Sequence, residues 1–157
     1  MKRQFINTVL ATVIFGLIGL GPAKAQDQAQ PGAARISLIQ GDVSTQRGDS
    51  GDWAAATVNT PVVLGDSVST GNGSRAEVQL DYANTLRLDQ GSMVKIADLT
   101  RNHIQVQVSQ GLVEFSVLKG TEANAEIDTP NMSVQTAGEG EYRIEIASPT
   151  ETRVTVR

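Results

Sequence analysis

The sequence predicts an all-β domain that is built from many short strands and preceded by a cleavable secretory signal. Apolar residues recur at every second position from Ile36 to Val156, which is typical of strands with one buried face. Turn residues interrupt this alternation about every 8 to 12 residues, and no segment shows a helical period. A short-stranded β-solenoid and a sandwich-like fold both fit the pattern, and periodicity alone does not separate them.

The first 25 residues have the organisation of a signal peptide. Lys2 and Arg3 precede an apolar run from Phe5 to Leu20, and Ala23-Lys24-Ala25 provides a cleavage site with small residues. The run is shorter than the roughly 20 apolar residues that cross a bilayer. We therefore expect cleavage after Ala25, no stable membrane span afterwards, and export to the periplasm. Anchoring by an uncleaved signal is the alternative.

Residues 26–34, QDQAQPGAA, are polar, contain a Pro-Gly pair and predict a flexible linker. The β domain is predicted to occupy residues 35–157. Its alternating apolar positions are, in chain order, Ile36 and Leu38; Ala76, Val78 and Leu80; Leu86 and Leu88; Val94 and Ile96; Ile104, Val106 and Val108; Val113, Phe115 and Val117; Met132 and Val134; Tyr142, Ile144 and Ile146; Val154 and Val156.

The segment GDSVSTGNGSRAEVQL, residues 65–80, is rich in glycine and hydroxyl residues. A phosphate-binding loop would be followed by a helix, but Ala76, Val78 and Leu80 alternate as a strand. Glycine and asparagine adopt positive φ at low cost. Gly71-Asn72-Gly73 is therefore predicted to be a structural turn.

The composition argues against several kinds of partner and site. The formal net charge is −4, and cleavage would also remove Lys2, Arg3 and Lys24, so the exported protein is acidic. Nucleic acid and anionic lipids are not expected as partners because both are bound by clustered cations. The chain has no cysteine, which excludes disulfides, thiolate nucleophiles and thiolate metal sites. We expect neither a cofactor nor a metal.

Several short motifs appear in a defined order along the domain. They are Trp53 with Thr57, Gly65–Thr70, Ser74–Leu80, Leu86–Leu88, Gly111–Phe115, Ile127–Pro130 and Glu141–Ile144. Together they resemble the FecR domain, over roughly Ile36 to Ile146. The resemblance implies an all-β fold and a structural role for the motif residues Trp53, Gly65, Asp66, Thr70, Gly111, Phe115, Thr129, Pro130 and Tyr142.

The best-known FecR proteins span the inner membrane, carry a cytoplasmic anti-sigma segment and receive a signal from an outer-membrane transporter. Only Met1–Gln4 precede the apolar run here, so we do not expect the anti-sigma role. The chain is more similar to stand-alone exported FecR-domain proteins. The resemblance thus implies a binding or signalling module of the cell envelope.

The last residues, Arg153–Arg157, alternate like a strand in progress. Relatives commonly continue beyond this point, so the sequence could be incomplete at its C-terminus. Two other interpretations are that this strand pairs internally or that its edge docks another envelope protein by strand addition. The sequence alone leaves all three open.

Side chains that could carry chemistry are few. His103 is the only histidine, and it shares the outward face of a predicted strand that we place in the interior of the sheet. Asp49 and Asp52 lack calcium-loop spacing. Trp53 is expected to fill the core, with a sugar-stacking surface as the alternative. No nucleophile, base and orienting group form a recognisable set, so we expect no enzyme and no catalytic residue. A carbohydrate or cell-wall binder is the alternative function.

Overall fold

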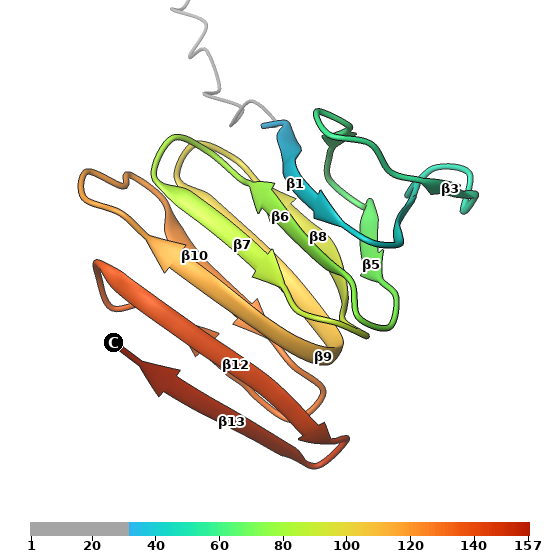
Figure 1. Ribbon diagram of the computed structural model, residues 1–157. Helices are drawn as coiled ribbons and strands as arrows, with labels where there is room; N and C mark the ends of the chain where they lie inside the picture. The colour runs from blue at the N-terminus through green and yellow to red at the C-terminus, as the bar shows by residue number, and fades with distance from the viewer. Residues whose placement is uncertain (1–31) are drawn as a thin grey trace, which may run out of the picture.

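The computed structural model describes residues 32–157, which form thirteen β-strands and no helix (Figure 1). The strands are β1 (Ala34–Gln40), β2 (Val43–Gln46), β3 (Trp53–Ala55), β4 (Pro61–Val62), β5 (Ser67–Thr70), β6 (Arg75–Gln79), β7 (Asn84–Leu88), β8 (Met93–Leu99), β9 (His103–Val117), β10 (Asn124–Asp128), β11 (Ser133–Gln135), β12 (Gly140–Ser148) and β13 (Glu151–Val156). The predicted all-β class is confirmed. The predicted signal peptide and most of the predicted linker lie outside the described residues.

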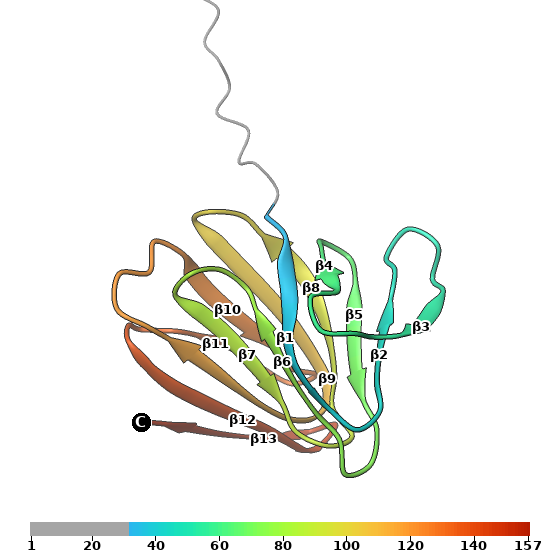
Figure 2. The ribbon, with the colours of Figure 1, turned by 45° about the horizontal axis from the view of Figure 1, so that its top comes forward.

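The strands form one continuous sheet that curls over on itself (Figure 2). One half, which we call sheet I, has the order β4-β1-β6-β7-β9-β12-β13. The other half, sheet II, has the order β3-β2-β5-β8-β9-β10-β11. All strand pairs are antiparallel except β9 with β10. This arrangement is sandwich-like, because a solenoid would stack successive strands in parallel.

Strand β9 belongs to both halves. Its first part, up to Gln110, pairs with β8 and β10 of sheet II, and its second part, from Gly111, pairs with β7 and β12 of sheet I. The prediction that the uncharged segment 102–111 lies inside the sheet is confirmed. Ile104, Val106 and Val108 are buried there. The central strand thus joins the two halves covalently.

Four segments pass from one sheet to the other side by side, and we call this line the crease. It consists of Gly41–Asp42, Gly71–Ser74, Asp89–Ser92 and Gln110–Leu112. Glycines with positive φ occur in all four segments. The neighbouring segments contact each other, since Gly71 N–H donates to Asp42 O at 2.9 Å and Gly91 N–H donates to Gly71 O at 3.2 Å. The crease therefore sets the curl of the sheet.

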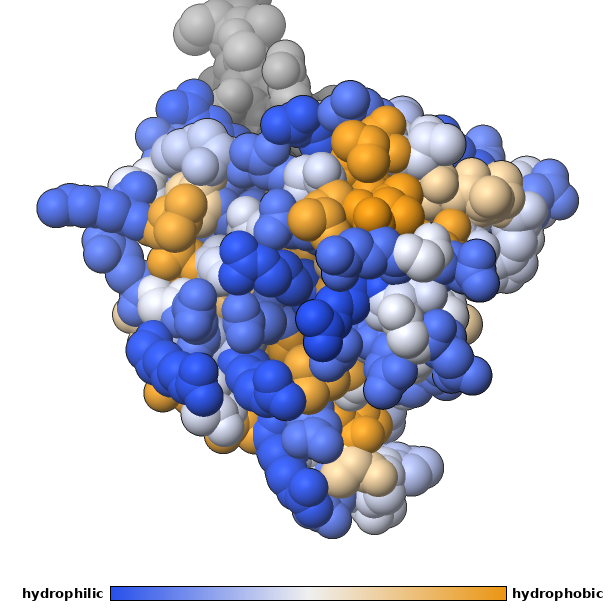
Figure 3. Space-filling model, viewed as in Figure 1, coloured by the Kyte–Doolittle hydropathy of each residue, from blue (hydrophilic) through white to orange (hydrophobic). Residues whose placement is uncertain are grey.

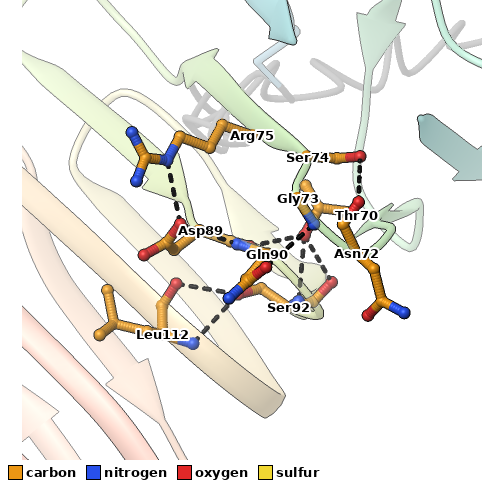
Figure 4. Close-up of polar contacts among 9 residues, drawn as sticks. All are labelled: Thr70, Asn72, Gly73, Ser74, Arg75, Asp89, Gln90, Ser92 and Leu112. Atoms are coloured by element: carbon orange, nitrogen blue, oxygen red, sulfur yellow. Dashed lines mark hydrogen bonds and ion pairs between the residues drawn. The ribbon is translucent and has the colours of Figure 1, made fainter. Parts of the chain in front are cut away.

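Buried hydroxyl groups hold the crease together (Figure 4). The Thr70 hydroxyl donates to Asp89 O at 2.6 Å and accepts from Ser92 N–H at 3.0 Å. The Ser92 hydroxyl donates to Leu112 O at 2.9 Å and accepts from Leu112 N–H at 3.0 Å. The Ser74 hydroxyl accepts from Asp42 N–H at 2.8 Å. Backbone groups that leave the ladders at the corner thus regain partners.

The predicted turn at Gly71-Asn72-Gly73 is confirmed, and it is one segment of the crease. Gly73 has a φ of 66°, whereas Gly71 does not have positive φ. A Cβ at Gly71 would instead lie 3.3 Å from the Cβ of Asp42. Crowding, rather than a left-handed backbone, restricts Gly71.

Replacing Gly73 by Val is expected to lower the free energy of unfolding by about 1 to 3 kcal/mol, because a β-branched residue is strained at positive φ. No atom lies within 4 Å of the added Cβ, so the loss would report backbone conformation alone. Urea denaturation of the two proteins measures it. An unchanged midpoint would show that this turn relaxes freely.

The core lies between the two sheets and consists mainly of Val, Ile and Leu, with Phe115 as its largest fully buried side chain. Most of the alternating positions point inward as predicted. Four positions remain exposed, namely Leu38, Met132, Val154 and Val156. A register shift between Ile36 and Leu38 inserts an extra residue into β1, which turns Leu38 to the outer face.

Candidate functional site

The curled sheet ends in four edge strands. They are β4 and β13 in sheet I and β3 and β11 in sheet II. Three of them are two or three residues long, whereas β13 has six residues. Figure 1 shows β13 in dark red along the free margin of sheet I. A long edge strand is the feature of this fold most suited to binding another chain.

The hairpin of β12 and β13 positions this edge. Tyr142 and Ile144 are buried in the core and pair with Val156 and Val154, so the inner face of β12 anchors the hairpin. The Tyr142 hydroxyl accepts from Ala137 N–H and donates to Gly138 O, both at 3.0 Å. The strand is thus held on one side by a fixed neighbour.

The backbone groups on the other side of β13 can be identified from the ladder. Arg157 and Glu141 exchange both N–H···O bonds at 3.0 Å. Opposed residues in antiparallel pairs alternate between bonded and non-bonded. Thr152, Val154 and Val156 therefore direct their N–H and C=O groups away from β12. Within residues 32–157, β13 pairs with β12 alone, so these groups face solvent.

The two faces of β13 differ in character. Thr152, Val154 and Val156 lie on the core side, where the two valines are still 37% and 57% exposed. Glu151, Arg153, Thr155 and Arg157 alternate with them and lie on the outer side. The edge therefore offers backbone groups, an uncovered apolar strip and charges of both signs.

A polar clamp joins the β13 hairpin to the turn between β10 and β11. The Thr152 hydroxyl lies 3.1 Å from Thr129 Oγ1 and 2.5 Å from Asn131 Oδ1. The Asn131 amide donates to Thr150 O at 3.2 Å. Both turns lie at the crease end of the sheets, because Thr152 pairs with Ile146 opposite Gly111, and Asp128 pairs with Gln107. The clamp thus fastens sheets I and II beside the crease, and Pro130 sits exposed in the fastened turn.

The outer face of sheet I carries a row of charges across neighbouring strands, and Figure 3 shows this face as largely hydrophilic. Glu77 accepts from the Ser37 hydroxyl at 2.8 Å and from Arg87 Nε at 2.9 Å, and Arg87 also reaches Glu114 at 3.2 Å. The hydrogen bonds that Ser37 and Arg87 donate lower the pKa of Glu77, and the acceptance of hydrogen bonds by Glu77 and Glu114 raises the pKa of Arg87. The Gln90 N–H and Arg75 likewise lower the pKa of Asp89.

A pH dependence of stability follows for Glu77. Because its pKa is lower in the folded chain than the ordinary 4.5, its contribution is complete above that pH and is lost as the pH falls through the folded value. Replacing Glu77 by Gln should cost less than about 1 kcal/mol at pH 7, since the ion pair is partly exposed. The difference in melting temperature between the two proteins should shrink below pH 4.5. A difference independent of pH would assign the loss to packing.

A family model described as FecR protein matches residues 66–157, which is more than half of the chain and includes β13. The chain belongs to the FecR family. Comparison with curated proteins and with solved structures gives no match. FecR domains are typically associated with the cell envelope and with signalling. In residues 32–157 there is no helix with the length and hydrophobicity that crossing a membrane requires.

Two motif residues of this FecR chain, Gly65 and Asp66, lie at a buried carboxylate, and a third, Thr70, lies at the other end of β5. Asp66 is 3% exposed and accepts hydrogen bonds from Arg47 Nη1 at 2.8 Å, Gly48 N–H at 2.9 Å and Val63 N–H at 3.1 Å. Gly65, with a φ of 88°, lets the chain turn directly before it. Thr70 follows on β5 and forms part of the crease. Asp66 and Thr70 of the GDSVST motif thus hydrogen-bond to neighbouring groups of the fold, and the structural role of the motif stays a prediction.

Replacing Asp66 by Ala is expected to lower the free energy of unfolding by about 2 to 4 kcal/mol, because two backbone N–H groups and one guanidinium lose their acceptor. Asp49, exposed in the neighbouring turn, provides the matched control. Asp49→Ala should change stability by less than about 0.5 kcal/mol. Equal losses for the two variants in thermal denaturation would contradict the structural role of Asp66.

The remaining motif residues lie in different parts of the fold. Gly111 is at the bend of β9, Phe115 is fully buried, and Tyr142 is 5% exposed. Thr129 and Pro130 form the turn of the clamp. The motif residues thus mark the crease, the core and the clamp rather than one site. They do not include the outward groups of β13.

The prediction that Trp53 fills the core is wrong. Trp53 begins the edge strand β3 and is 45% exposed. Strand β3 lies at the margin of sheet II, beyond the reach of sheet I, and none of its three residues is buried. The indole is therefore accessible from solvent, and the sugar-stacking interpretation stays a prediction.

Apolar side chains gather near this margin. In Figure 3 they appear at the upper right, over β1 and the segment around β4. The exposed large apolar residues of these segments are Leu38, Val58, Val63 and Leu64.

His103 and the two loop aspartates are not brought together. His103 starts β9, is half-buried and pairs with Asn124 of β10. Asp49 and Asp52 are exposed in the β2–β3 turn. Residues 32–157 contain no group of three or more His, Asp or Glu side chains placed to hold a metal ion.

Sequence reasoning missed Ser74 and Ser92, the buried hydroxyls of the crease. A signal for them exists. Gly71, Gly91 and Gly111 recur at equal spacing, and each belongs to a segment that passes between the sheets. Ser92 directly follows one of these glycines, and Ser74 follows Gly73, which lies two residues after another of them.

Proposed function

We propose that this FecR-family chain is a non-enzymatic binding or signalling module that is exported to the periplasm and docks another envelope protein. The observation that carries the proposal is the free edge of β13 at residues 152–156, within the described chain. The partner would add a strand alongside Arg153–Arg157. Periplasmic processing predicts a mature chain that starts at Gln26, which intact mass spectrometry measures.

The chemistry of the edge supports strand addition. A partner strand would satisfy the outward N–H and C=O groups of Thr152, Val154 and Val156, which supply affinity without sequence preference. The exposed Val154 and Val156 would pack against apolar side chains of the partner, which supply specificity. The clamp and Tyr142 keep the strand ordered before binding, so little conformational entropy is lost.

The structural engagement of the carboxylates supports a non-enzymatic role. Asp66 accepts three hydrogen bonds, and Asp89 accepts from Gln90 N–H at 2.9 Å and Arg75 Nε at 3.0 Å. Glu77 is held by Ser37 and Arg87. Hydrogen bonds lower the pKa of Asp89 and of Glu77, and carboxyl groups with lowered pKa values are poor general acids at neutral pH.

The decisive experiment blocks the edge without disturbing the fold. Val154→Pro removes a backbone N–H that points away from β12, so the hairpin keeps its own hydrogen bonds. Val154→Thr retains the N–H and is the matched control. Immobilised protein is exposed to solubilised envelope extract, and captured proteins are quantified by mass spectrometry. Proteins retained by the Thr variant and lost from the Pro variant are expected. Identical capture by both would end the strand-addition proposal.

The exposure of Trp53 favours carbohydrate binding as a second candidate function. An indole on an edge strand can stack on the face of a sugar ring. Purified peptidoglycan or a glycan array should then quench the fluorescence of this single tryptophan. Trp53→Ala should abolish retention on the polymer. If the Ala variant is still retained on the polymer, Trp53 does not form the carbohydrate-binding surface.

A further inference from the structure

We propose that the β13 edge also pairs with β13 of a second copy of this chain, antiparallel, about a two-fold axis at Val154. Self-pairing would make sheet I continuous across two molecules. This inference goes beyond the proposed function, although it uses the same edge. Three observations lead to it: the direction of the backbone groups, the distribution of charge and the exposure of the two valines.

The backbone limits the registers that are available. Thr152, Val154 and Val156 carry the outward N–H and C=O groups, as the Arg157–Glu141 pair establishes. In an antiparallel dimer, outward residues of one strand must oppose outward residues of the other. A two-fold axis at residue 153, 154 or 155 satisfies this condition. In each of these registers the two β13 strands overlap over most of their length.

The charges distinguish these registers. An axis at Val154 places Glu151 opposite Arg157 of the second copy, twice by symmetry, and Arg153 opposite Thr155. An axis at residue 153 places Arg153 opposite Arg153, and an axis at residue 155 places Arg153 opposite Arg157. Opposite charges across a strand pair are stabilising, and like charges are destabilising. Of these three registers, only the one with its axis at Val154 pairs opposite charges and places no like charges opposite each other.

The apolar side chains fit the same register. Val154 would contact Val154 of the second copy, and Val156 would contact Thr152 of the second copy. Both valines lie on the core side of β13 and are substantially exposed in the single chain. Pairing would cover them and would protect an edge that otherwise invites less specific association.

Self-pairing and the proposed partner would compete for one strand. This consequence rests on the proposed function, because it requires a partner at Arg153–Arg157. The dimer itself does not. Measurements on the purified full chain, without extract, therefore test the dimer separately from partner capture.

A cysteine scan tests the register, since the chain contains no cysteine of its own. Under mild oxidation, a cysteine on the two-fold axis lies within disulfide distance of its symmetry mate. Val154→Cys should cross-link at least about tenfold faster than Arg153→Cys or Thr155→Cys, with Ser50→Cys in an exposed turn as the background rate. Fastest cross-linking at residue 153 or 155, or rates equal to the background, would overturn the proposal.

A charge-reversal series tests the pairing by sedimentation equilibrium. Glu151→Arg and Arg157→Glu should each weaken the dimer about tenfold, because two attractive pairs become repulsive. An equimolar mixture of the two variants should recover the wild-type dissociation constant, since each copy then supplies the sign that the other lacks. This recovery also shows that both variants are folded. A monomeric wild type at millimolar concentration, or a mixture as weak as its components, would refute self-pairing.

Discussion

Val106→Asp is expected to unfold most of the protein at room temperature, with a loss of about 4 kcal/mol or more in the free energy of unfolding. Val106 is completely buried in β9, between Ile96 of β8 and Ile127 of β10. A carboxylate there would have no partner, and an unpaired buried charge is among the most costly substitutions. Loss of the cooperative transition in circular dichroism measures the effect.

The neighbouring position provides the matched control. Gln107 lies on the same strand, faces outward and is exposed. Gln107→Asp should cost less than about 1 kcal/mol, because surface substitutions rarely cost more. If both variants denature at similar urea concentrations, the inward and outward faces of β9 have been assigned wrongly.

Gly111→Ala is expected to be the most damaging single-methyl substitution, with a loss of about 3 kcal/mol or more. Gly111 has a φ of 88°, and an added Cβ would lie 2.5 Å from Ser92 Cα and 2.9 Å from Gly91 O. Ser92 cannot move away from the added methyl group, because its hydroxyl donates to Leu112 O and accepts from Leu112 N–H. Backbone strain and steric overlap therefore add.

Gly120 separates these two contributions. Its φ is 87°, nearly that of Gly111, but no atom lies within 4 Å of an added Cβ. Gly120→Ala should therefore cost only about 1 kcal/mol, which is the backbone part. The difference between the two alanine variants in urea denaturation measures the close approach of the chain at the crease. Equal values would mean that the crease has room for a side chain.

Alternation in the sequence was sufficient to predict the class of the fold and most of the core. It worked because one face of nearly every strand is buried, as at Ile104, Val106 and Val108. It failed at Leu38, because an inserted residue shifts the strand by one position. After such a shift, the side chains that would have faced the core face outward. Trp53 was expected in the core because it belongs to the FecR-like motif pattern, yet burial depends on what covers a strand, and β3 is at a margin.

The candidate site was predicted in outline only. The alternation of residues 153–157 indicated a terminal strand, but pairing with β12 could not be distinguished from an open edge. Internal pairing is confirmed, because β13 is bonded to β12, while its other side has no partner strand within residues 32–157 and docking there stays a prediction. The clamp between Thr152 and Asn131 was not predictable, since these residues are distant in sequence and neither belongs to a motif that implies contact. This contact can be recognised only once the positions of sheet I and sheet II relative to each other are known.

The shared strand β9 has a mechanical consequence. Because its two parts lie at the centre of sheet II and of sheet I, neither sheet can melt while the other persists, and the domain should resist pulling as one cooperative block. A load applied at β13 would pass through β12 directly to β9 and from there to the far margin. Strand β9 is therefore the route by which a load at the margin of sheet I is expected to reach sheet II.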